Sequence, residues 1–346
     1  MVTNSTVYVL HEYGAPSHYN ALIELGKQNG FKVKFRIFSL GALSSALYHR
    51  KFGLFIKSIQ FLLSLLFRNK TTIILGIAPF NSTLRILIKL LNRHQVYYHT
   101  SYTCWDGSNM VYPTNSKHLL NIWKFFLQKG NSHIFAVSNK TKEELIKNKF
   151  ATSSQISLVY HSLNAKITPI FHSKNNNFIY SGRLIDSKGI KELLSIFERR
   201  PNANLTIIGQ GPLASLVNEY AEKCNNISYL GYISGLDNLI PTYQDNSFLI
   251  MNSIRSQSWE ELFGISIIEG MACGCVPLTT DHSGPKEIIT SGINGFISKE
   301  HHISESIDRA ICMSDEEYQI LRNNAIERGQ DFYSDKIALN WSKILE

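Results

Sequence analysis

The chain has 346 residues, of which 44% are hydrophobic and 18% are charged. This composition is typical of a globular protein large enough for two domains, and it excludes an intrinsically disordered chain. The five cysteines are few and mostly scattered, which excludes a disulfide-rich secreted scaffold and fits reduced thiols. Because residues 1–5 lack the features of a signal peptide, we expect a cytoplasmic protein.

The net charge of +8 is divided unevenly along the chain. Residues 1–170 carry 20 Lys and Arg against 5 Asp and Glu, whereas residues 171–346 carry 15 against 22. A basic half attracts anionic partners, either nucleic acid or a lipid surface. The basic residues alternate with long apolar runs and no nucleic-acid-binding motif is present, so we expect no nucleic-acid partner.

The first half alternates short apolar runs with helical patterns. Strands are expected at 7–10, 31–38, 72–75, 96–99, 134–137 and 155–160. Strands that alternate with helices predict an α/β fold built on a parallel sheet. His99 ends one of these strands, and the carboxyl edge of a parallel sheet is where ligands bind.

Two stretches of the first half combine apolar and basic residues. Residues 41–67 read as one or two helices whose apolar stretch, interrupted by Lys57, is too short to span a membrane. A second basic helix with aromatic residues is expected at 118–129. Two interpretations stay open, namely helices packed in the first domain or a surface that lies on an anionic membrane.

The second half repeats the alternation after a polar run at 173–177 that has the composition of a linker. Strands are expected at 177–181, 205–208, 227–230, 247–251 and 276–279. The glycines of Gly209–Gln210–Gly211 do not complete a G-x-G-x-x-G pattern, and neither does the loop after the first strand. A Rossmann oxidoreductase is therefore not expected.

Residues 260–272 read as a loop that enters a helix between two strands. Gly264 at the helix start would let backbone N–H groups approach an anion, which the helix dipole also favours. Glu261 would project from the loop beside that anion, and Glu269 from the second helical turn. An anion pocket between two carboxylates suits a nucleotide-sugar, with its phosphates and its hydroxyls on either side.

Glu261 and Glu269 form an E-x7-E pair, and the segments GMACGCVP, GPKEI and GINGF follow it at 270–277, 284–288 and 292–296. Over about residues 176–297 this string resembles the donor-binding half of family 4 retaining glycosyltransferases. The resemblance implies the GT-B fold, in which two Rossmann-like domains face a cleft. It places an acceptor-binding domain at 1–168, a nucleotide-sugar-binding domain at 169–330, and a C-terminal helix at 331–346 that returns to the first domain.

The resemblance also implies roles for individual residues. Glu269 would bind the ribose, while Glu261 and His99 would act on the transferred sugar as the catalytic residues. The donor diphosphate would bind Arg183, Lys188, Gly264, Ile265 and Ser266. The nucleobase would contact Gly209, Tyr232 and Ile233. The loop with Gly14 and Ala15 would contact either the donor or the acceptor. Of the family's usual glycine pair in that last loop, only Gly14 remains.

The expected activity is transfer of a hexosyl or N-acetylhexosaminyl group, with retention of configuration, from a nucleotide-diphosphate sugar, with UDP favoured. The expected acceptor is a saccharide, lipid-linked and presented at the inner face of a membrane, in the synthesis of a surface polysaccharide or glycan. No D-x-D motif is present, so we expect neither a metal nor a cofactor. The alternative is a degenerate subunit that binds the sugar nucleotide without transferring the sugar.

Overall fold

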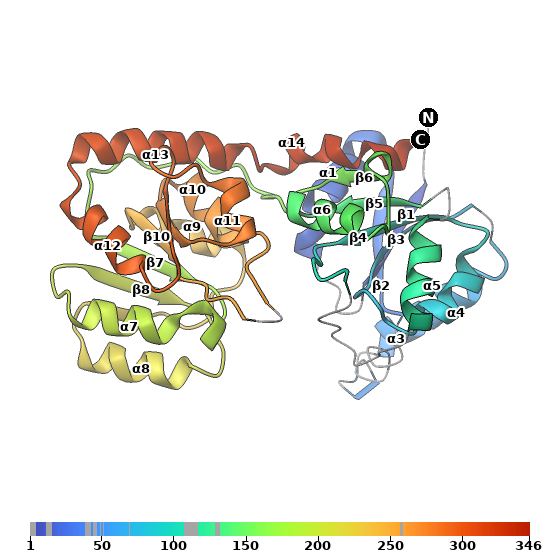
Figure 1. Cartoon of the computed structure of the whole chain (residues 1–346), viewed down its shortest axis with the longest axis horizontal. Coiled ribbons are helices and arrows are strands. Elements are labelled where there is room, and N and C mark those ends of the chain that lie inside the picture. The colour runs from blue at the N-terminus through green and yellow to red at the C-terminus, as the bar shows by residue number, and fades with distance from the viewer. Residues whose placement is uncertain are drawn as a thin grey trace. The chain divides into compact units, whose positions relative to one another are not determined.

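The computed structural model describes residues 5–11, 16–38, 43, 47–48, 50, 52–68, 70–106, 117–128, 132–256 and 259–346. The chain divides into two compact units, Met1–Ser162 with Ser334–Glu346, and Leu163–Tyr333. Each unit holds a six-stranded parallel sheet flanked by helices (Figure 1). The α/β fold predicted from the alternating pattern is confirmed, and so are the two Rossmann-like domains that the resemblance implies.

The sheet of the first unit has the strand order β2-β1-β3-β4-β5-β6. Its strands are β1 Thr6–His11, β2 Lys32–Arg36, β3 Thr72–Gly76, β4 Gln95–Thr100, β5 His133–Ala136 and β6 Ile156–Leu158. The helices between them are η1 Pro16–Tyr19, α1 Asn20–Asn29, α3 Phe52–Ser64, α4 Leu84–Leu91, α5 Lys117–Gln128, α6 Asn139–Lys147 and η2 Ser153–Gln155. The C-terminal elements α14 Ser334–Ala338 and η4 Leu339–Leu345 complete this unit.

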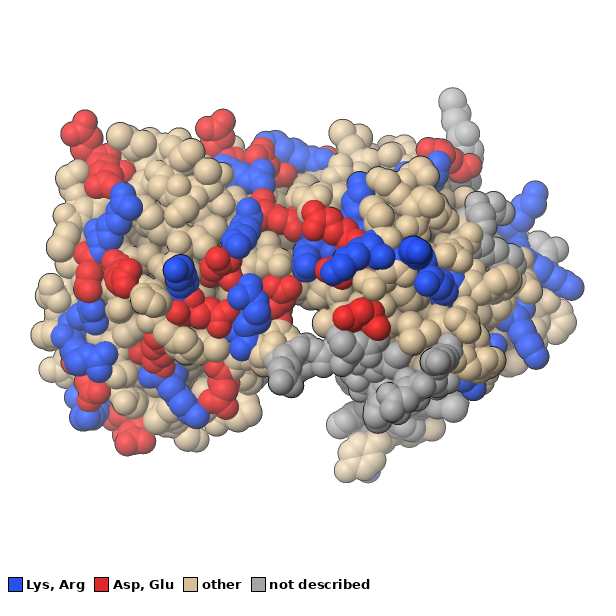
Figure 2. All heavy atoms as spheres, viewed as in Figure 1, with Lys and Arg blue, Asp and Glu red and all other residues tan. Residues whose placement is uncertain are grey.

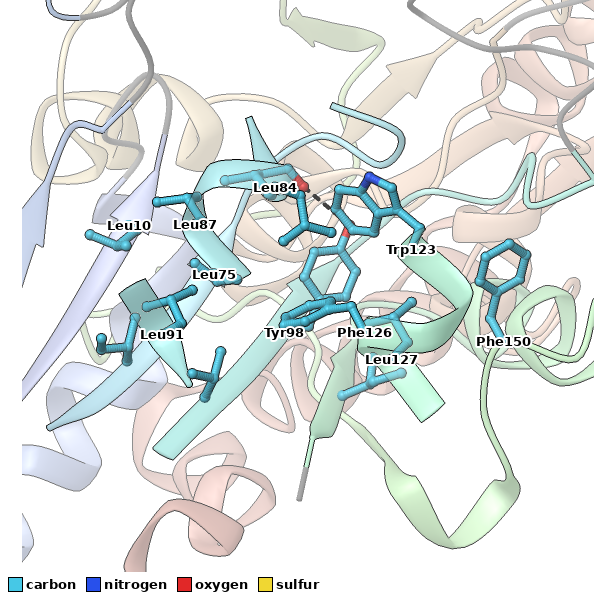
Figure 3. Close-up of a cluster of buried hydrophobic side chains, with 14 of the residues drawn as sticks. Leu10, Leu75, Leu84, Leu87, Leu91, Tyr98, Trp123, Phe126, Leu127 and Phe150 are labelled. Carbon is cyan, nitrogen blue, oxygen red and sulfur yellow. Dashed lines mark hydrogen bonds between the residues drawn. The ribbon is translucent and has the colours of Figure 1, made fainter. Parts of the chain in front are cut away.

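One core of the first unit lies between the sheet and helices α4 and α5 (Figure 3). Leu84, Leu87 and Leu91 recur at helical spacing on α4 and are all buried. Trp123 of α5 packs edge-on against Tyr98 of β4, with ring centroids 5.4 Å apart. Burial of each such side chain contributes about 1.5–3 kcal/mol to folding, so this face fixes the position of β4.

The C-terminal segment covers part of the other face of this sheet. Trp341 of η4 is buried with its ring centroid 4.5 Å from that of Phe135 on β5. The hydroxyl of Tyr97 on β4 donates a hydrogen bond to the carbonyl oxygen of Lys343 at 2.9 Å. Residues more than 200 positions apart in the sequence are therefore packed together in one unit.

Helix α3 has a buried face and an exposed apolar face. Phe61 is 5% exposed and stacks on Tyr8 at 4.2 Å, whereas Ile56 and Leu63 are 51% and 56% exposed. Helix α3 thus contributes both to the core of the first unit and to an apolar surface. Among the helices that the structure describes, none is long and apolar enough to cross a membrane.

The sheet of the second unit has the strand order β12-β11-β10-β7-β8-β9. Its strands are β7 Asn177–Ser181, β8 Asn204–Ile208, β9 Ile227–Tyr229, β10 Phe248–Met251, β11 Val276–Thr280 and β12 Phe296–Ser298. Its helices are η3 Asp186–Lys188, α7 Ile190–Glu198, α8 Ala214–Lys223, α9 Leu236–Gln244, α10 Ile265–Cys273, α11 Ser283–Ile288, α12 Ile303–Cys312 and α13 Asp315–Gln330.

The order of winding reverses between two adjacent strands of the second sheet. From β7 the chain winds outward through β8 and β9, and from β10 it winds in the opposite direction through β11 and β12. In open parallel sheets, ligands bind at the carboxyl ends of the strands where this reversal occurs. The loops after β7 and β10 are therefore where the fold favours a site.

Candidate active site

Gly264 is the N-cap of helix α10 and directly follows the loop after β10. Gly264 has a φ of +95°, which is a left-handed conformation that favours glycine. A Cβ atom there would also lie only 2.7 Å from the Cδ1 atom of Ile267. Because the first N–H groups of a helix have no partner within it, those at Gly264, Ile265 and Ser266 can bind an anion.

Two predicted site residues, Lys188 and Glu261, contact each other directly. The Lys188 ammonium forms an ion pair with the Oε2 atom of Glu261, and the two side chains are only 12% and 13% exposed. Ser253 donates a hydrogen bond to the same carboxylate oxygen at 3.1 Å. The Lys188 ammonium also lies 4.9 Å from the ring centroid of Trp259, at cation–π distance. The structure thus brings together the loops after β7 and β10.

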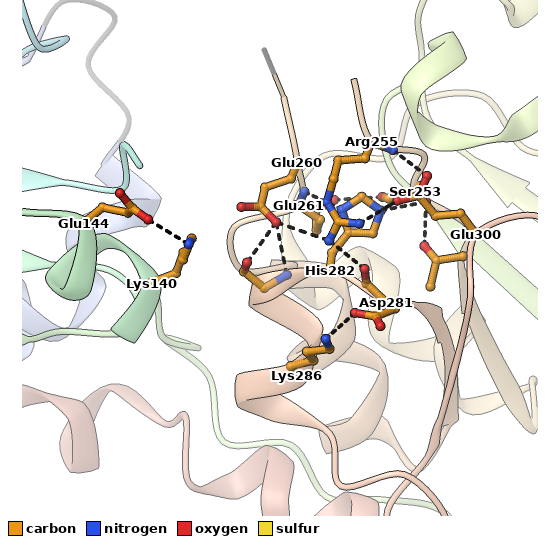
Figure 4. A network of polar contacts seen from close by, with 12 residues as sticks. Lys140, Glu144, Ser253, Arg255, Glu260, Glu261, Asp281, His282, Lys286 and Glu300 are labelled. Carbon is orange, nitrogen blue, oxygen red and sulfur yellow. Dashed lines mark hydrogen bonds and ion pairs between the residues drawn. The ribbon is translucent and has the colours of Figure 1, made fainter. Parts of the chain in front are cut away.

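His282, which the sequence analysis missed, fixes the backbone of this loop (Figure 4). Its Nδ1 atom accepts the backbone N–H of Glu261 at 3.1 Å, and its Nε2 atom donates to the carbonyl oxygen of Ser253 at 2.8 Å. Full burial lowers the pKa of His282, so the ring is neutral at neutral pH with the proton on Nε2. Its place at the carboxyl end of β11 was the signal that could have identified it.

Gly284 holds the same loop against the start of α11. Its backbone N–H donates to the carbonyl oxygen of Glu261 at 2.9 Å. A Cβ atom at this position would lie 2.2 Å from the backbone nitrogen of Phe263, so only glycine allows this approach. Glu261 is thus fixed by hydrogen bonds at its backbone N–H, its carbonyl and its carboxylate.

Arg255 and Glu260 tie the outer part of the loop to neighbouring turns (Figure 4). The Arg255 guanidinium donates to the Glu300 carboxylate at 2.9 Å and to the Asp281 carbonyl oxygen at 2.7 Å. The Glu260 carboxylate accepts the hydroxyl of Ser283 at 2.8 Å. Glu260, the residue before Glu261, is therefore engaged at the start of α11.

Glu269 lies on α10 and is held by a buried tyrosine of α9. The hydroxyl of Tyr243 donates to the Oε2 atom of Glu269 at 3.0 Å. Burial raises the pKa of Glu269, and the hydrogen bond from Tyr243 opposes this shift. The hydroxyl of Tyr243 also interacts with Ser181 at the end of β7. Glu269 is therefore oriented by groups from α9 and β7.

Arg183 lies in the turn after β7, and its side chain is exposed. Tyr180 fixes this turn by donating its hydroxyl proton to the carbonyl oxygen of Arg183 at 2.8 Å. Burial raises the pKa of Tyr180, the Glu261 carboxylate raises it further, and Arg183 lowers it, so both charges lie within electrostatic range of this phenol. Within the described residues, the guanidinium of Arg183 forms no hydrogen bond or ion pair and is available to a ligand.

The turns after β8 and β9 pack beside the turn after β7. Gly209 has a φ of +149°, and a Cβ atom there would lie 1.8 Å from the carbonyl oxygen of Gly182. Its N–H donates to the carbonyl oxygen of Gly231 at 2.9 Å. Beyond Gly231 the Tyr232 side chain is 62% exposed and Ile233 is half-buried. The structure places these three predicted nucleobase residues at one edge of the sheet, and their role stays a prediction.

His99 lies at the carboxyl end of β4 in the first unit and is buried. Its Nδ1 atom is hydrogen-bonded to the hydroxyl of Tyr19 at 3.1 Å, and its ring centroid is 5.3 Å from that of Trp341. Burial, and then the neighbouring His161, His18 and His11, lower its pKa well below the ordinary value. His99 is therefore neutral at neutral pH.

Gly14 and Ala15, predicted as a donor or acceptor loop of the first unit, lie outside the described residues. In the described ranges, no group of three or more His, Cys, Asp or Glu side chains could hold a metal ion.

Parts of this chain are similar to a known protein family and to curated proteins. Residues 165–331 match the family described as glycosyl transferases group 1. The second unit thus carries the glycosyl transferases group 1 signature. The chain is also 24% identical over 222 residues to an uncharacterized glycosyltransferase of Methanocaldococcus jannaschii, a match that covers 63% of this chain and 60% of the relative. The chain thus spans about 60% of the length of the first curated relatives that it matches.

Solved structures resemble the chain over nearly its whole length. Sucrose-phosphate synthase from Thermosynechococcus elongatus superposes with a TM-score of 0.73 and 16% identity, covering 99% of this chain and 98% of that one. The Anabaena protein HepE in complex with UDP and glucose superposes with a TM-score of 0.70 and 16% identity, covering 99% of each chain. The chain therefore has the predicted GT-B fold.

Proposed function

We propose that the chain is a glycosyltransferase that moves a sugar from a nucleoside diphosphate sugar to a saccharide acceptor. One observation carries this proposal: Lys188, Glu261 and the start of α10 converge where the winding of the second sheet reverses. A cation, a carboxylate and free helix N–H groups match the diphosphate and the sugar of such a donor. The glycosyl transferases group 1 signature over the same unit supports it.

In this proposal the donor diphosphate binds Arg183, Lys188 and the N–H groups of Gly264, Ile265 and Ser266. Arg183 offers a planar fork of donors and Lys188 a point charge, and both stabilise the negative charge that develops on the leaving diphosphate. We propose that no metal and no cofactor is required, because these groups supply the stabilisation. Lys188 would exchange Glu261 for the phosphate when the donor binds.

Glu269 is proposed to bind the ribose hydroxyls. Its Oε2 atom accepts the proton of Tyr243, which leaves Oε1 for the ligand. Gly209, Tyr232 and Ile233 are proposed to line the nucleobase. We favour UDP because HepE, a structure with the same fold, contains UDP and glucose. A hexosyl or N-acetylhexosaminyl group would then be the transferred sugar.

Glu261 and His99 are the proposed catalytic residues. Once released from Lys188, the Glu261 carboxylate would bind hydroxyls of the transferred sugar. Neutral His99 would contribute the ring nitrogen that Tyr19 does not engage. We propose retention of configuration, in which the acceptor attacks the face from which the diphosphate leaves. The negative charge that then develops on the leaving diphosphate is stabilised by the cations and the helix N–H groups.

The acceptor is proposed to be a lipid-linked saccharide at the inner face of a membrane, used in polysaccharide biosynthesis. Helix α3 and the residues after it carry five exposed apolar side chains, namely Phe52, Ile56, Leu63, Leu66 and Phe67. The exposed cations Lys57 and Arg68 belong to the same stretch. The face drawn in Figure 2 shows many acidic side chains over the second unit and few over the first. Basic and apolar groups together favour an anionic lipid surface, with each nearby cation contributing about 1 kcal/mol.

Transfer is tested by measuring nucleoside diphosphate release from UDP-sugars in the presence of saccharide acceptors. Acceptor-dependent release is the expected result, and release should be lost in Glu261→Gln. The alternative, a degenerate subunit that binds the donor without transfer, predicts donor binding with no release.

Membrane binding is tested by co-sedimentation with vesicles. The protein is expected to sediment with anionic vesicles, and the double substitution Lys57→Glu with Arg68→Glu should weaken this binding. Absence of co-sedimentation at low salt would contradict the proposed membrane surface.

A further inference from the structure

A pocket of about 730 Å³ lies at the amino edge of the first sheet. It opens beside the starts of β4 and β5 and the turn before β3, and the C-terminal segment forms one side of it. The edge is opposite to the carboxyl edge that carries His99. The pocket therefore takes no part in the proposed glycosyl transfer, and a ligand bound there would be independent of that function.

The walls of the pocket are held by hydrogen bonds between the turns that form it. The Nδ1 atom of His94 accepts the N–H of Thr71 at 3.2 Å, and its Nε2 atom donates to the carbonyl oxygen of Leu65 at 3.1 Å. The N–H of Lys70 donates to the carbonyl oxygen of Arg93 at 2.9 Å. Lys70 is held at a φ of +56°, a conformation that few residues other than glycine adopt. The backbones that carry Lys70 and Arg93 are thus bound to each other.

Cationic side chains dominate this pocket. Lys70, Arg93 and Lys343 line it against one carboxylate, that of Glu346, which is ion-paired with Lys343. In the part of the chain that the structure describes, the side chains of Lys70 and Arg93 form no hydrogen bond or ion pair. His133 is neutral at neutral pH, because burial and then Lys343 lower its pKa. A bound anion would reduce the repulsion between the cations and accept hydrogen bonds from them.

The rest of the lining indicates what the anion is attached to. Asn92, Gln95, Ser132 and Ser154 offer amide and hydroxyl groups, and the volume is larger than one inorganic ion requires. Leu66 and Phe67 directly follow Leu65, whose carbonyl His94 binds, and they are 52% and 87% exposed. We propose that the pocket binds the phosphate group of a polyhydroxylated phosphate ester, such as a glycerophosphate. Arg93 binds the phosphate through its planar fork and Lys70 as a point charge.

The same chemistry occurs in a soluble glycerophosphate and in the headgroup of a phospholipid, so the test uses both. Glycerol 3-phosphate is titrated into the full chain by calorimetry, and vesicles of phosphatidylglycerol in phosphatidylcholine are used for co-sedimentation. Arg93→Glu is expected to weaken binding by about tenfold or more. Glu346→Gln, which frees Lys343, is expected to strengthen it. Lys34→Glu reverses an exposed cation outside the pocket and is the matched control.

Each outcome decides the proposal. Binding of glycerol 3-phosphate that Arg93→Glu weakens supports the site with a soluble ligand, and vesicle binding alone with the same response supports it with a lipid headgroup. Lys70→Glu serves as the second variant if Arg93→Glu does not fold. The proposal is wrong if neither probe binds, or if the pocket variants and Lys34→Glu behave alike.

Discussion

The ammonium of Lys188 and the carboxylate of Glu261 form an ion pair that joins the loop after β7 to the loop after β10. In the proposed reaction both groups contact the donor, so donor binding replaces this pair with two new contacts. Both side chains are mostly buried, and removal of one partner of such a pair leaves the other charge uncompensated. The pair therefore keeps two site residues ordered while competing with the ligand for both of them.

Glu261→Gln is expected to reduce turnover strongly while binding of free UDP stays the same or becomes tighter. The substitution removes the carboxylate that holds the transferred sugar, and it also releases Lys188 for the phosphates. Steady-state kinetics and calorimetry with UDP measure the two effects separately. Glu260→Gln, at the neighbouring carboxylate that Ser283 engages, is the control. Weaker UDP binding in Glu261→Gln would show that this residue supports the diphosphate instead.

Arg183→Ala is expected to weaken binding of the donor by about tenfold or more. A hydrogen bond to a charged group contributes about 1.5–3 kcal/mol, and about 1.4 kcal/mol corresponds to a factor of ten. Because the guanidinium is exposed, folding should be unaffected. Calorimetry with the nucleotide-sugar measures the effect, and Arg199→Ala, directly after α7, is the control. Equal affinities in Arg183→Ala and the wild type would remove Arg183 from the site.

His282→Ala is expected to destabilise the protein and to lower turnover. The partly buried N–H of Glu261 and the buried carbonyl oxygen of Ser253 would each lose a partner, at a cost of up to about 1–3 kcal/mol per group. Urea unfolding measures the free energy of unfolding, and kinetics measure turnover in the variant that remains folded. The exposed His302→Ala is the control. Full activity in His282→Ala would mean that the Glu261 loop needs no such support.

The stability of the first unit is expected to fall as the pH falls from about 6.5 to about 4. Burial lowers the pKa of His11 to about 4 and that of His161 to about 3, from an ordinary value of 6.5. In this window the unfolded chain binds protons that the folded state excludes, so each group removes up to about 1.4 kcal/mol per pH unit. Urea unfolding across this range measures the slope. His161→Gln should show a shallower decline than His302→Gln, and parallel declines would contradict the assignment.

Much of the fold follows from local patterns in the sequence. Alternation of apolar runs and helical spacing predicted each strand of the two sheets except β12. The sequence placed Gly264 at the start of α10, and the structure shows there a left-handed φ that favours glycine. The spacing of Glu261 and Glu269 placed both carboxylates near that helix, one in the loop and one in its second turn.

The contacts within the site could not be predicted in this way. His282 binds groups 21 and 29 residues away, and Lys188 meets Glu261 across 73 positions. Residues so far apart in the sequence come into contact only when the sheet is assembled, so no local sequence pattern predicts these contacts. The same holds for Tyr243, which reaches Glu269 from the preceding helix. The amino-edge pocket likewise depends on the C-terminal segment, which contributes Lys343.

The central claim is that a nucleoside diphosphate sugar binds at Arg183, Lys188 and Glu269, and a thermal-shift screen tests it most directly. A ligand that binds only the folded state raises stability by about 2.7 kcal/mol at a hundred times its Kd. UDP-, GDP- and ADP-sugars are compared on the wild type and on Arg183→Ala with Glu269→Ala. UDP-sugars alone are expected to raise the melting temperature of the wild type, and to raise that of the double variant far less. No shift with any of the sugars, or equal shifts in both proteins, would contradict it.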